Sequence, residues 1–201
     1  ELKNYFYDSY SPNSLPDNDI CFLKEDSLLN LWIGTQEGLA IYNRGEDNFT
    51  LIYHNNAPVQ AKTACLLTDG ILFAGTGLWI YSYADRQLHS LPIINKGKAI
   101  NDYFKYIKPW KKNTYVVGTQ WKGVYLYHTD SPQLTPFTSC KKQHISSYFI
   151  DKQKNLWLSP YGEGMICYDV NGQEIARYST QNSDLCNDII LDMLIYKDEL
   201  W

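Results

Sequence analysis

The stretch Leu31-Trp32-Ile33-Gly34-Thr35, followed closely by Gly38-Leu39-Ala40-Ile41-Tyr42, decides the fold that we predict for this chain. It consists of an apolar run that ends in Gly-Thr, a short polar turn, and a second apolar run that ends in Tyr. The same phrase returns with substitutions at residues 72–81, 115–127 and 156–168, and a further copy begins at residues 200–201. The chain is therefore built from an internal repeat.

The spacing of the repeat indicates the kind of structure. The second residue of each copy is Trp32, Phe73, Val116, Trp157 and Trp201, so that successive copies are 41, 43, 41 and 44 residues apart. A period in the low forties is the length of one four-stranded propeller blade. One such sheet cannot bury both of its faces alone and must stack on its neighbours. We predict an all-β fold made of β-propeller blades, each with four antiparallel strands.

Turn and strand signals divide residues 1–201, a single partial propeller, into four complete repeats. In the first repeat the expected strands cover residues 20–23, 31–33, 39–42 and 49–53, separated by segments rich in Asn, Asp, Ser, Pro and Gly. Residues 1–12 are expected to form the last strand of a preceding blade, and residues 182–201 to open a further one. The two end pieces either pair to close a five-bladed ring or belong to a longer propeller. The complete repeats cover residues 13–53, 57–91, 98–137 and 144–178.

Side chains at equivalent positions carry the expected packing. The series Trp32, Phe73, Val116 and Trp157 is expected to fill the gaps between successive sheets. The glycines at 34, 75 and 118 are expected to let the chain bend sharply after the second strand.

Composition excludes several classes of function. The formal net charge is −4 and the pI is about 5.5, which argues against a nucleic-acid partner. No run of eighteen apolar residues exists, so we expect no membrane contact by this segment. The five cysteines have an odd count and no Cys-x-x-Cys pair, which predicts neither a disulfide framework nor a zinc site. Three of them are expected to be small core residues. The cysteines are Cys21, Cys65, Cys140, Cys167 and Cys186, and the expected core members are Cys21, Cys65 and Cys167.

The first repeat resembles the two-component-regulator propeller repeat. The resemblance is carried by residues 13–15, 25–26, 31–35, 38–39 and 42, with Phe49 and Tyr53. That repeat builds the periplasmic sensor regions of hybrid two-component systems in Bacteroides-type bacteria. The resemblance extends over the chain, is fair in the fourth repeat and is weaker in the middle two.

The resemblance implies a sensor rather than an enzyme. In that family two seven-bladed propellers and an immunoglobulin-like module precede a membrane helix, a histidine kinase and a response regulator. The sensors are homodimers anchored in the inner membrane, and their ligands are oligosaccharides. The resemblance therefore implies a periplasmic location, an oligosaccharide partner, a dimeric parent chain and no cofactor.

Motifs for other chemistry are weak. Residues 75–77, Gly-Thr-Gly, lack the helix and the Lys of a phosphate-binding loop. The four histidines fall one to a repeat without i, i+4 pairing, which predicts surface residues and no metal site. Asp26 and Asp151 each precede a Trp by six residues and loosely resemble the structural Asp-box turn of sialidase-type propellers. No spacing identifies a catalytic carboxylate pair or nucleophile.

The turns between the second and third strands are the candidate ligand-binding site, because in propellers these turns and the links between blades gather at one end of the channel. An aromatic ring there offers a stacking plane to a sugar, while amide and charged groups can bind its hydroxyls. Trp121 lies in an insertion, so repeat packing does not require it; the alternative is that it packs on a neighbouring loop. Lys122 with Lys111 and Lys112 forms either a basic patch for an acidic glycan or a solvated face. The candidate residues are Gln36, Glu37, Gln120, Trp121, Lys122, Tyr161 and Glu163.

Three functions remain open from sequence. The first is a ligand-sensing segment of a hybrid two-component sensor. The second is a scaffold propeller that holds a protein partner. The third is a polysaccharide-active propeller enzyme.

Overall fold

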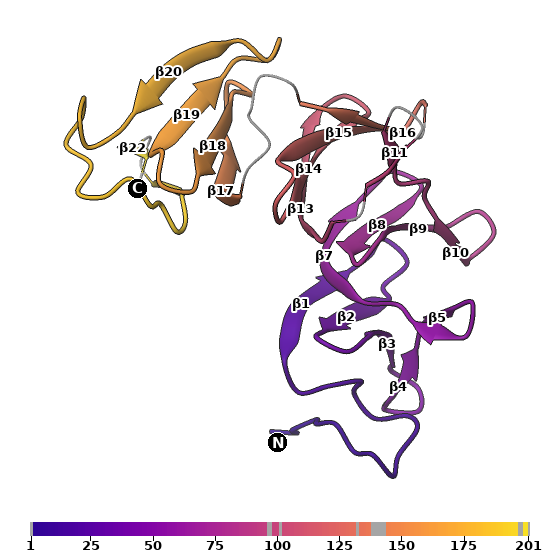
Figure 1. Ribbon diagram of the computed structural model, residues 1–201. Helices are drawn as coiled ribbons and strands as arrows, with labels where there is room; N and C mark the ends of the chain where they lie inside the picture. The colour runs from indigo at the N-terminus through magenta and orange to yellow at the C-terminus, as the bar shows by residue number, and fades with distance from the viewer. Residues whose placement is uncertain are drawn as a thin grey trace. The chain divides into compact units, whose positions relative to one another are not determined.

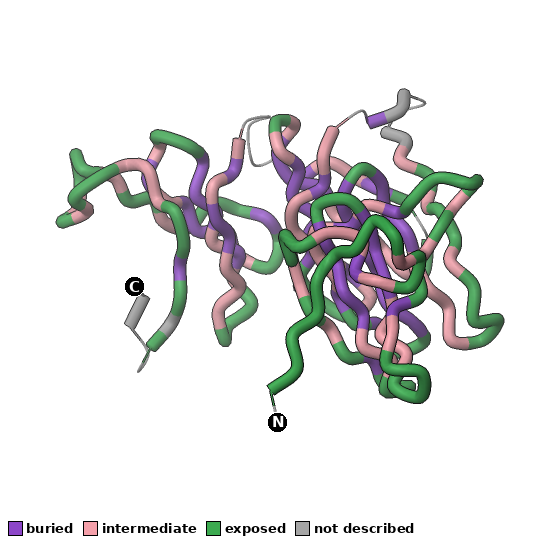
Figure 2. The backbone as a smooth tube through the Cα atoms, turned by 90° about the horizontal axis from the view of Figure 1, so that it is seen from below, coloured by how far each residue is buried: buried purple, intermediate pink, exposed green. Residues whose placement is uncertain are grey.

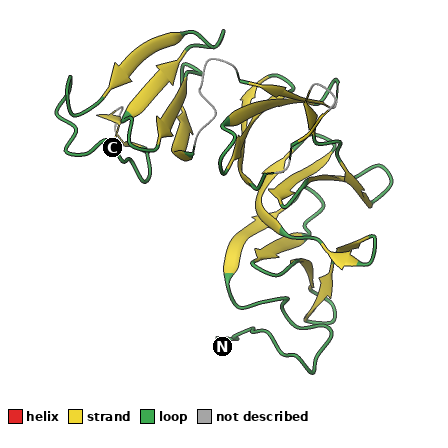
Figure 3. Cartoon of the chain, viewed as in Figure 1, coloured by secondary structure: helices red, strands yellow, loops and turns green. Residues whose placement is uncertain are grey.

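The computed structural model describes residues 2–95, 98–100, 102–131, 133–137, 144–196 and 199–200. Cys140 and Trp201 lie outside these residues. The described part of the chain contains strands and turns but no helix, as Figure 3 shows. No segment of it therefore qualifies as a membrane-spanning helix.

Most strands in the described part of the chain belong to four sheets of four strands, and in each sheet consecutive strands lie side by side (Figure 1). This confirms the predicted all-β architecture of propeller blades. The first blade comprises β1 (Ile20–Glu25), β2 (Leu31–Thr35), β3 (Leu39–Asn43) and β4 (Asn48–Leu51). The second comprises β7 (Ala61–Leu66), β8 (Gly70–Gly75), β9 (Leu78–Ser82) and β10 (Gln87–Ser90). The third comprises β13 (Phe104–Lys111), β14 (Thr114–Thr119), β15 (Val124–His128) and β16 (Gln133–Pro136). The fourth comprises β17 (Ile145–Ile150), β18 (Leu156–Pro160), β19 (Met165–Tyr168) and β20 (Glu174–Tyr178).

Outside the four sheets, the described residues form three two-stranded hairpins. The fourth strand of the first blade ends at Leu51, and the chain then makes a separate hairpin, so this strand is shorter than predicted. The hairpins are β5 (Tyr53–His54) with β6 (Ala57–Pro58), β11 (Ile94–Asn95) with β12 (Lys98–Ala99), and β21 (Ile195–Tyr196) with β22 (Glu199–Leu200). Residues 2–12 form no strand, and the expectation that they complete a preceding blade stays a prediction.

The chain divides into two compact units. The first contains residues 1–93 and 104–107, and the second contains residues 94–103 and 108–201. In both units the buried residues follow the middle strands of the sheets, while the turns are exposed (Figure 2).

Aromatic packing between the first and second blades forms the core of the first unit. The Trp32 ring lies 4.8 Å from the ring of Phe73 and 4.8 Å from that of Tyr81. Leu39 and Ile71 are fully or almost fully buried in the same cluster. Two of the four residues predicted to fill gaps between sheets therefore contact each other directly.

A buried carboxylate holds the first hairpin of the first blade. One Asp26 oxygen accepts hydrogen bonds from the backbone N–H groups of Leu28 and Asn30, and the other accepts from the Asn30 amide and the Trp32 indole, at 2.8–2.9 Å. The bend itself occurs at Leu29, whose φ is 65°. Asn30 is thus a partner of the carboxylate.

The fourth blade repeats this arrangement with Asp151, Asn155 and Trp157. The Asp151 carboxylate accepts from the Asn155 side chain at 2.9 Å and from the Trp157 indole at 3.0 Å, and Lys154 has a φ of 67°. In the same unit the Trp110 indole of the third blade donates to the Lys154 carbonyl at 2.8 Å. The turn of the fourth blade is therefore also a contact between two blades.

The glycines near the ends of β2 and β8 are required for close approach, and the expectation that they let the chain bend after these strands stays a prediction. Neither Gly34 nor Gly75 has a positive φ. A Cβ at Gly34 would lie 2.1 Å from the Phe22 ring and 2.7 Å from the Ala61 carbonyl oxygen of the next blade. At Gly75 a Cβ would lie 2.1 Å from the Gln60 carbonyl oxygen. At Gly75 backbone, which cannot move aside cheaply, therefore occupies the space that a side chain would need.

We predict that Gly75→Ala lowers the free energy of unfolding by about 2–3 kcal/mol, because the new methyl group overpacks against backbone. Gly45→Ala is the matched control, since its nearest neighbour would lie at 3.5 Å, and should change stability by less than about 0.5 kcal/mol. Urea unfolding of both variants gives the comparison. Equal stability of the two would contradict the packing role of Gly75.

A second prediction concerns Asp26 and pH. Burial alone would raise the pKa of its carboxyl, but the hydrogen bonds from Trp32, Asn30 and Leu28 outweigh it and lower the pKa below its usual 3.8. Since the folded-state pKa is the lower one, this carboxylate stabilises the fold above pH 3.8 and loses that contribution as the pH falls further. Asp26→Ala should cost about 3 kcal/mol at neutral pH, because it leaves buried donors unpaired.

The difference between the wild type and Asp26→Ala should shrink when urea unfolding is repeated at about pH 3.5. A difference that stays the same across this range would show that the charge of Asp26 does not stabilise the hairpin.

Candidate functional site

One backbone hydrogen bond recurs in all four blades and positions the candidate site. The first residue of the turn between the second and third strands donates its N–H to the carbonyl of the residue just before the blade's first strand. As a result, one residue from the link between blades always lies beside the turn. The pairs are Gln36 with Asp19 at 3.0 Å, Thr76 with Gln60 at 3.4 Å, Gln120 with Tyr103 at 2.8 Å, and Tyr161 with His144 at 2.9 Å.

Next to these pairs the first strand contains an irregularity in three blades. The register shifts between Ile20 and Phe22, between Ala61 and Thr63, and between Ile145 and Ser147. An extra residue at such a point re-aims the neighbouring side chains. In the second blade this residue is Lys62, whose ammonium donates to the backbone carbonyls of Thr35 and Gln36 and to the Gln36 side chain.

In the turn of the first blade, the polar groups of Gln36 are therefore already hydrogen-bonded within the protein. The Gln36 amide oxygen and carbonyl are both acceptors for Lys62, and Glu37 beside it is exposed. Gln36 and Glu37 belong to the first unit, whereas the other five predicted site residues belong to the second.

In the second unit, three aromatic rings lie in a row. The Trp121 ring from the third blade's turn lies 5.3 Å from the His144 ring, and His144 lies 5.7 Å from the Tyr161 ring of the fourth blade's turn. The two outer side chains are exposed, Trp121 at 63% and Tyr161 at 59%. We name Trp121, His144 and Tyr161 the aromatic row. Large aromatic groups gathered in this way on a surface are suited to stack against a ligand.

Asp102 holds the Trp121 end of the aromatic row. One of its carboxylate oxygens accepts from the backbone N–H groups of Trp121 at 2.9 Å and of Lys122 at 2.8 Å. Its other oxygen accepts from the N–H of Tyr103 at 2.8 Å. Asp102 therefore ties the turn to the strand entry and fixes the backbone from which Trp121 projects.

Backbone geometry fixes the Tyr161 end. Gly162 and Gly164 have φ values of 75° and 71°, in the left-handed region that glycine adopts readily. The N–H of Glu163 donates to the Pro160 carbonyl at 3.0 Å and that of Gly164 to the Asp188 carbonyl at 2.9 Å. The Glu163 carboxylate lies 3.5 Å from the Arg177 guanidinium, so it is part of an ion pair.

The possible basic patch of Lys111, Lys112 and Lys122 does not form. Lys111 and Lys112 lie at the hairpin between β13 and β14, while Lys122 lies past the other end of β14. The Lys111 ammonium instead lies over the Trp110 ring, 4.2 Å from its centroid. The six residues of β14 separate the two ends by roughly 17 Å, too far for the three ammonium groups to bind one small anion.

The structure thus brings Trp121 and Tyr161 together and adds His144, which the sequence analysis did not select. A signal for His144 existed, because it directly precedes the first strand of its blade, where links between blades meet the turns. Gln120 and Lys122 flank Trp121, and Glu163 flanks the Tyr161 turn. Whether these residues bind a ligand stays a prediction.

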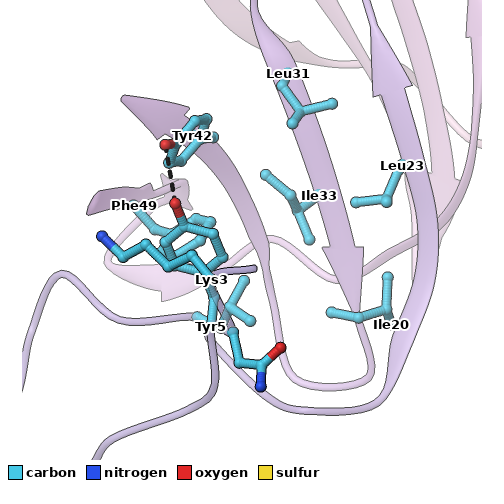
Figure 4. Close-up of a pocket in the computed structure, with 10 residues that line it drawn as sticks. Lys3, Tyr5, Ile20, Leu23, Leu31, Ile33, Tyr42 and Phe49 are labelled. Carbon is cyan, nitrogen blue, oxygen red and sulfur yellow. Dashed lines mark hydrogen bonds between the residues drawn. The ribbon is translucent and has the colours of Figure 1, made fainter. Parts of the chain in front are cut away.

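A separate hollow lies on the first blade (Figure 4). It has a volume of about 450 Å³, with aliphatic walls that include Ile20, Leu23 and Ile33. At its rim the Tyr5 and Tyr42 hydroxyls lie 3.1 Å apart, and both donate to Asp47, at 2.5 and 2.6 Å. The Lys3 ammonium, followed by the hydroxyls of Tyr42 and Tyr5, lowers the pKa of Asp47. The bonds to Asp47 and to Tyr5 raise the pKa of Tyr42. The polar groups at the rim of this hollow thus bond to one another, and its walls are apolar. Apolar walls of this kind are expected on a blade face that packs against a neighbouring blade.

The thiols and the remaining polar groups suggest no reactive centre among the described residues. Burial raises the pKa of Cys65 and of Cys167 to about 11, which is expected for inert core thiols. Cys21 is half-buried, and Cys186 is exposed. Within the same described ranges no group of three His, Cys, Asp or Glu residues is placed to hold a metal ion.

No protein-family model matches the chain, and no curated protein matches it either. Several solved structures do match the chain. The extracellular domain of the hybrid two-component system BT3049 from B. thetaiotaomicron is 20% identical, with a TM-score of 0.71 over 96% of this chain and 26% of that one. PorZ, a surface component of the type-IX secretion system of Porphyromonas gingivalis, is 14% identical, with a TM-score of 0.70 over 96% of this chain and 31% of that one.

A further match is the WD40 β-propeller domain of Doa1, at 10% identity and a TM-score of 0.57 over 87% of this chain and 56% of that one. At these identities the likeness shows the fold, that of propeller blades. The chain spans about a quarter to a third of the first two of these proteins. The similarity to extracellular domains of two-component sensors, expected from the repeat, is thus found in the structure.

We predict that Asp102→Ala frees the Trp121 turn without unfolding the chain. Amide hydrogen exchange at Trp121 and Lys122 should become at least about tenfold faster, because two charge-assisted hydrogen bonds are lost. Asp130→Ala is the matched control, since Asp130 bonds the Asn113 side chain at the other end of the blade. Unchanged exchange at both amides would show that Asp102 does not hold the turn.

Proposed function

We propose that this chain is a ligand-sensing propeller segment of a hybrid two-component sensor, located in the periplasm, and that it binds an oligosaccharide without turning it over. The observation that carries the proposal is the aromatic row. Two exposed rings and an imidazole lie together on turns where a packed repeat requires none of them. The likeness to extracellular sensor domains supports the cellular role.

The chemistry of the aromatic row supports a sugar as the ligand. The flat C–H faces of a pyranose stack on aromatic planes, and the edges of His and Tyr can exchange hydrogen bonds with hydroxyl groups. Binding of this kind needs no nucleophile or general acid. The nearby Glu163 is paired with Arg177, which suits a structural role better than proton transfer.

In the parent sensor, binding would alter the arrangement of a homodimer. A ligand can drive such a change only through a difference in its affinity for two arrangements. The signal would then pass through a membrane helix to a histidine kinase.

We predict saturable oligosaccharide binding that Trp121→Ala weakens by about tenfold, the effect of losing one aromatic contact of about 1.4 kcal/mol. Isothermal titration calorimetry gives the affinity, and chromatography of the same samples shows whether the sugar is cleaved. Tyr10→Ala is the control, since Tyr10 is an exposed aromatic residue in the first unit.

If the wild type cleaves the sugar and Glu163→Gln abolishes the cleavage, the chain is an enzyme and the proposal of a sensor is wrong. If no sugar binds, and a protein partner binds the wild type but not Trp121→Ala, the scaffold function is favoured.

The sensor role has a separate test in the gene. We expect the reading frame that encodes this chain to contain further copies of the repeat and to continue into a membrane helix, a histidine kinase and a receiver. A frame that encodes a propeller without these modules would contradict the sensor role.

A further inference from the structure

We propose that Asn171 is a site of spontaneous conversion to isoaspartate, and that Asp169 holds this conversion in check while the fourth blade is folded. The site lies in the turn of residues 169–173, which joins β19 to β20. This turn follows β19, whereas the Tyr161 turn precedes it, so the two turns lie at opposite ends of the same strand. The inference is therefore independent of the proposed function.

The chemistry requires only the two residues and water. Asn171 and Gly172 form the single Asn-Gly pair of the chain. The glycine nitrogen gives up its proton to a base and attacks the side-chain carbonyl carbon of asparagine. The new carbon–nitrogen bond closes a five-membered succinimide, and the side-chain amide takes up a proton and leaves as ammonia. Water then opens the succinimide to aspartate or to isoaspartate. Glycine favours the attack because no side chain crowds its nitrogen.

Asp169 bonds both of the groups that would have to react. The N–H of Gly172 donates to the Asp169 carbonyl at 2.9 Å. The side-chain amide of Asn171 donates to one oxygen of the Asp169 carboxylate at 3.2 Å, and its backbone N–H donates to the other at 2.8 Å. The glycine nitrogen and the asparagine amide are thus held apart from each other by bonds to a third residue.

Burial and charge protect the glycine nitrogen further. Asn171 is exposed, whereas Gly172 is buried, so a base in solution does not reach the N–H that must lose its proton. Hydrogen bonds from the N–H groups of Gln173 and Asn171 lower the pKa of the Asp169 carboxyl, which is therefore ionised at neutral pH. A negative charge beside the nitrogen makes its deprotonation less favourable.

Conversion would disrupt the turn that prevents it. A carboxylate in place of the Asn171 amide faces the Asp169 carboxylate, and like charges at this distance repel. Isoaspartate also adds one methylene to a backbone turn that is closed by two bonds of 2.8 Å between Asp169 and Gln173. We therefore expect the conversion to loosen β20, which lies at the edge of its sheet. The change is one-way, because the ammonia is lost to solvent.

The test compares the rate of conversion in the whole chain, folded in buffer and unfolded in urea, at neutral and mildly alkaline pH. Trypsin cuts after Lys154 and Arg177, and the peptide of residues 155–177 contains both Asn171 and Asn155. Mass spectrometry of this peptide follows the change of each amide to an acid, and fragmentation distinguishes isoaspartate from aspartate. Asn155 is an internal control: its side chain also donates to an aspartate, at 2.9 Å, but the Leu156 side chain crowds the nitrogen that would attack.

We expect Asn171 to convert at least about tenfold more slowly in the folded chain than in the unfolded one, because its reacting groups are bonded only in the folded turn. Folded Asp169→Ala should lose most of this protection, and Asp169→Asn, which keeps an acceptor oxygen, should keep part of it. Asp85→Ala is the matched control, because Asp85 bonds the Gln87 N–H in the last hairpin of the second blade, which contains no Asn-Gly pair. It should leave the conversion of Asn171 unchanged.

Amide hydrogen exchange across β20 is measured on the same samples. It should stay slow in unconverted Asp169→Ala, which shows that the hairpin remains formed, and become faster in the converted wild type.

Four outcomes would overturn the inference. If Asn171 converts no faster than Asn155 in the unfolded chain, Asn171 is not a modification site. If it converts equally fast in the folded and unfolded chains, the turn gives no protection. If Asp169→Ala does not speed the conversion, or does so only together with fast exchange across β20, Asp169 does not protect the reacting pair itself. If the converted wild type exchanges the β20 amides as slowly as before, the conversion does not open the hairpin.

Discussion

The backbone hydrogen bond that closes each blade determines where the chemically useful side chains lie. It runs from the first N–H of the turn after the second strand to the carbonyl just before the first strand, at 2.8–3.4 Å in all four blades. Since a blade is a meander, the two segments are far apart in sequence but meet at one end of the sheet. His144 lies beside Tyr161 for this reason, and Asp102 can reach the backbone of Trp121.

Most of the fold could be predicted because its information is local and repeated. The period of 41–44 residues and the recurring Gly-Thr phrase give the blade and its four strands. The reason for the glycines could not be predicted. Gly34 makes room for the Phe22 ring and the Ala61 carbonyl, Gly75 makes room for the Gln60 carbonyl, and sequence does not show which groups pass close by. Similarly, the pairing of Asp26 with Trp32 could be noticed in the sequence, but only the structure shows that Asn30 also bonds the Asp26 carboxylate.

The candidate site could be predicted only in part. Trp121 was identifiable as a residue that repeat packing does not need, and the turns that carry Trp121 and Tyr161 follow from the strand order. His144 was missed although its place directly before the first strand was a signal, because a single histidine does not by residue type indicate a binding site. The basic patch was wrong because Lys122 lies at the opposite end of β14 from Lys111 and Lys112. Gln36 accepts hydrogen bonds from Lys62, which lies at an irregularity of the first strand.

The indole N–H signals of the chain in a nitrogen–proton NMR spectrum test the central claim most directly. Trp32 and Trp110 have their indole N–H groups bonded internally, to Asp26 and to the Lys154 carbonyl, while the Trp121 side chain is exposed. On titration with a neutral oligosaccharide, the account predicts that the Trp121 signal shifts and saturates while those of Trp32 and Trp110 stay in place. A bound sugar that leaves the Trp121 signal unmoved would show that the aromatic row is not the binding site.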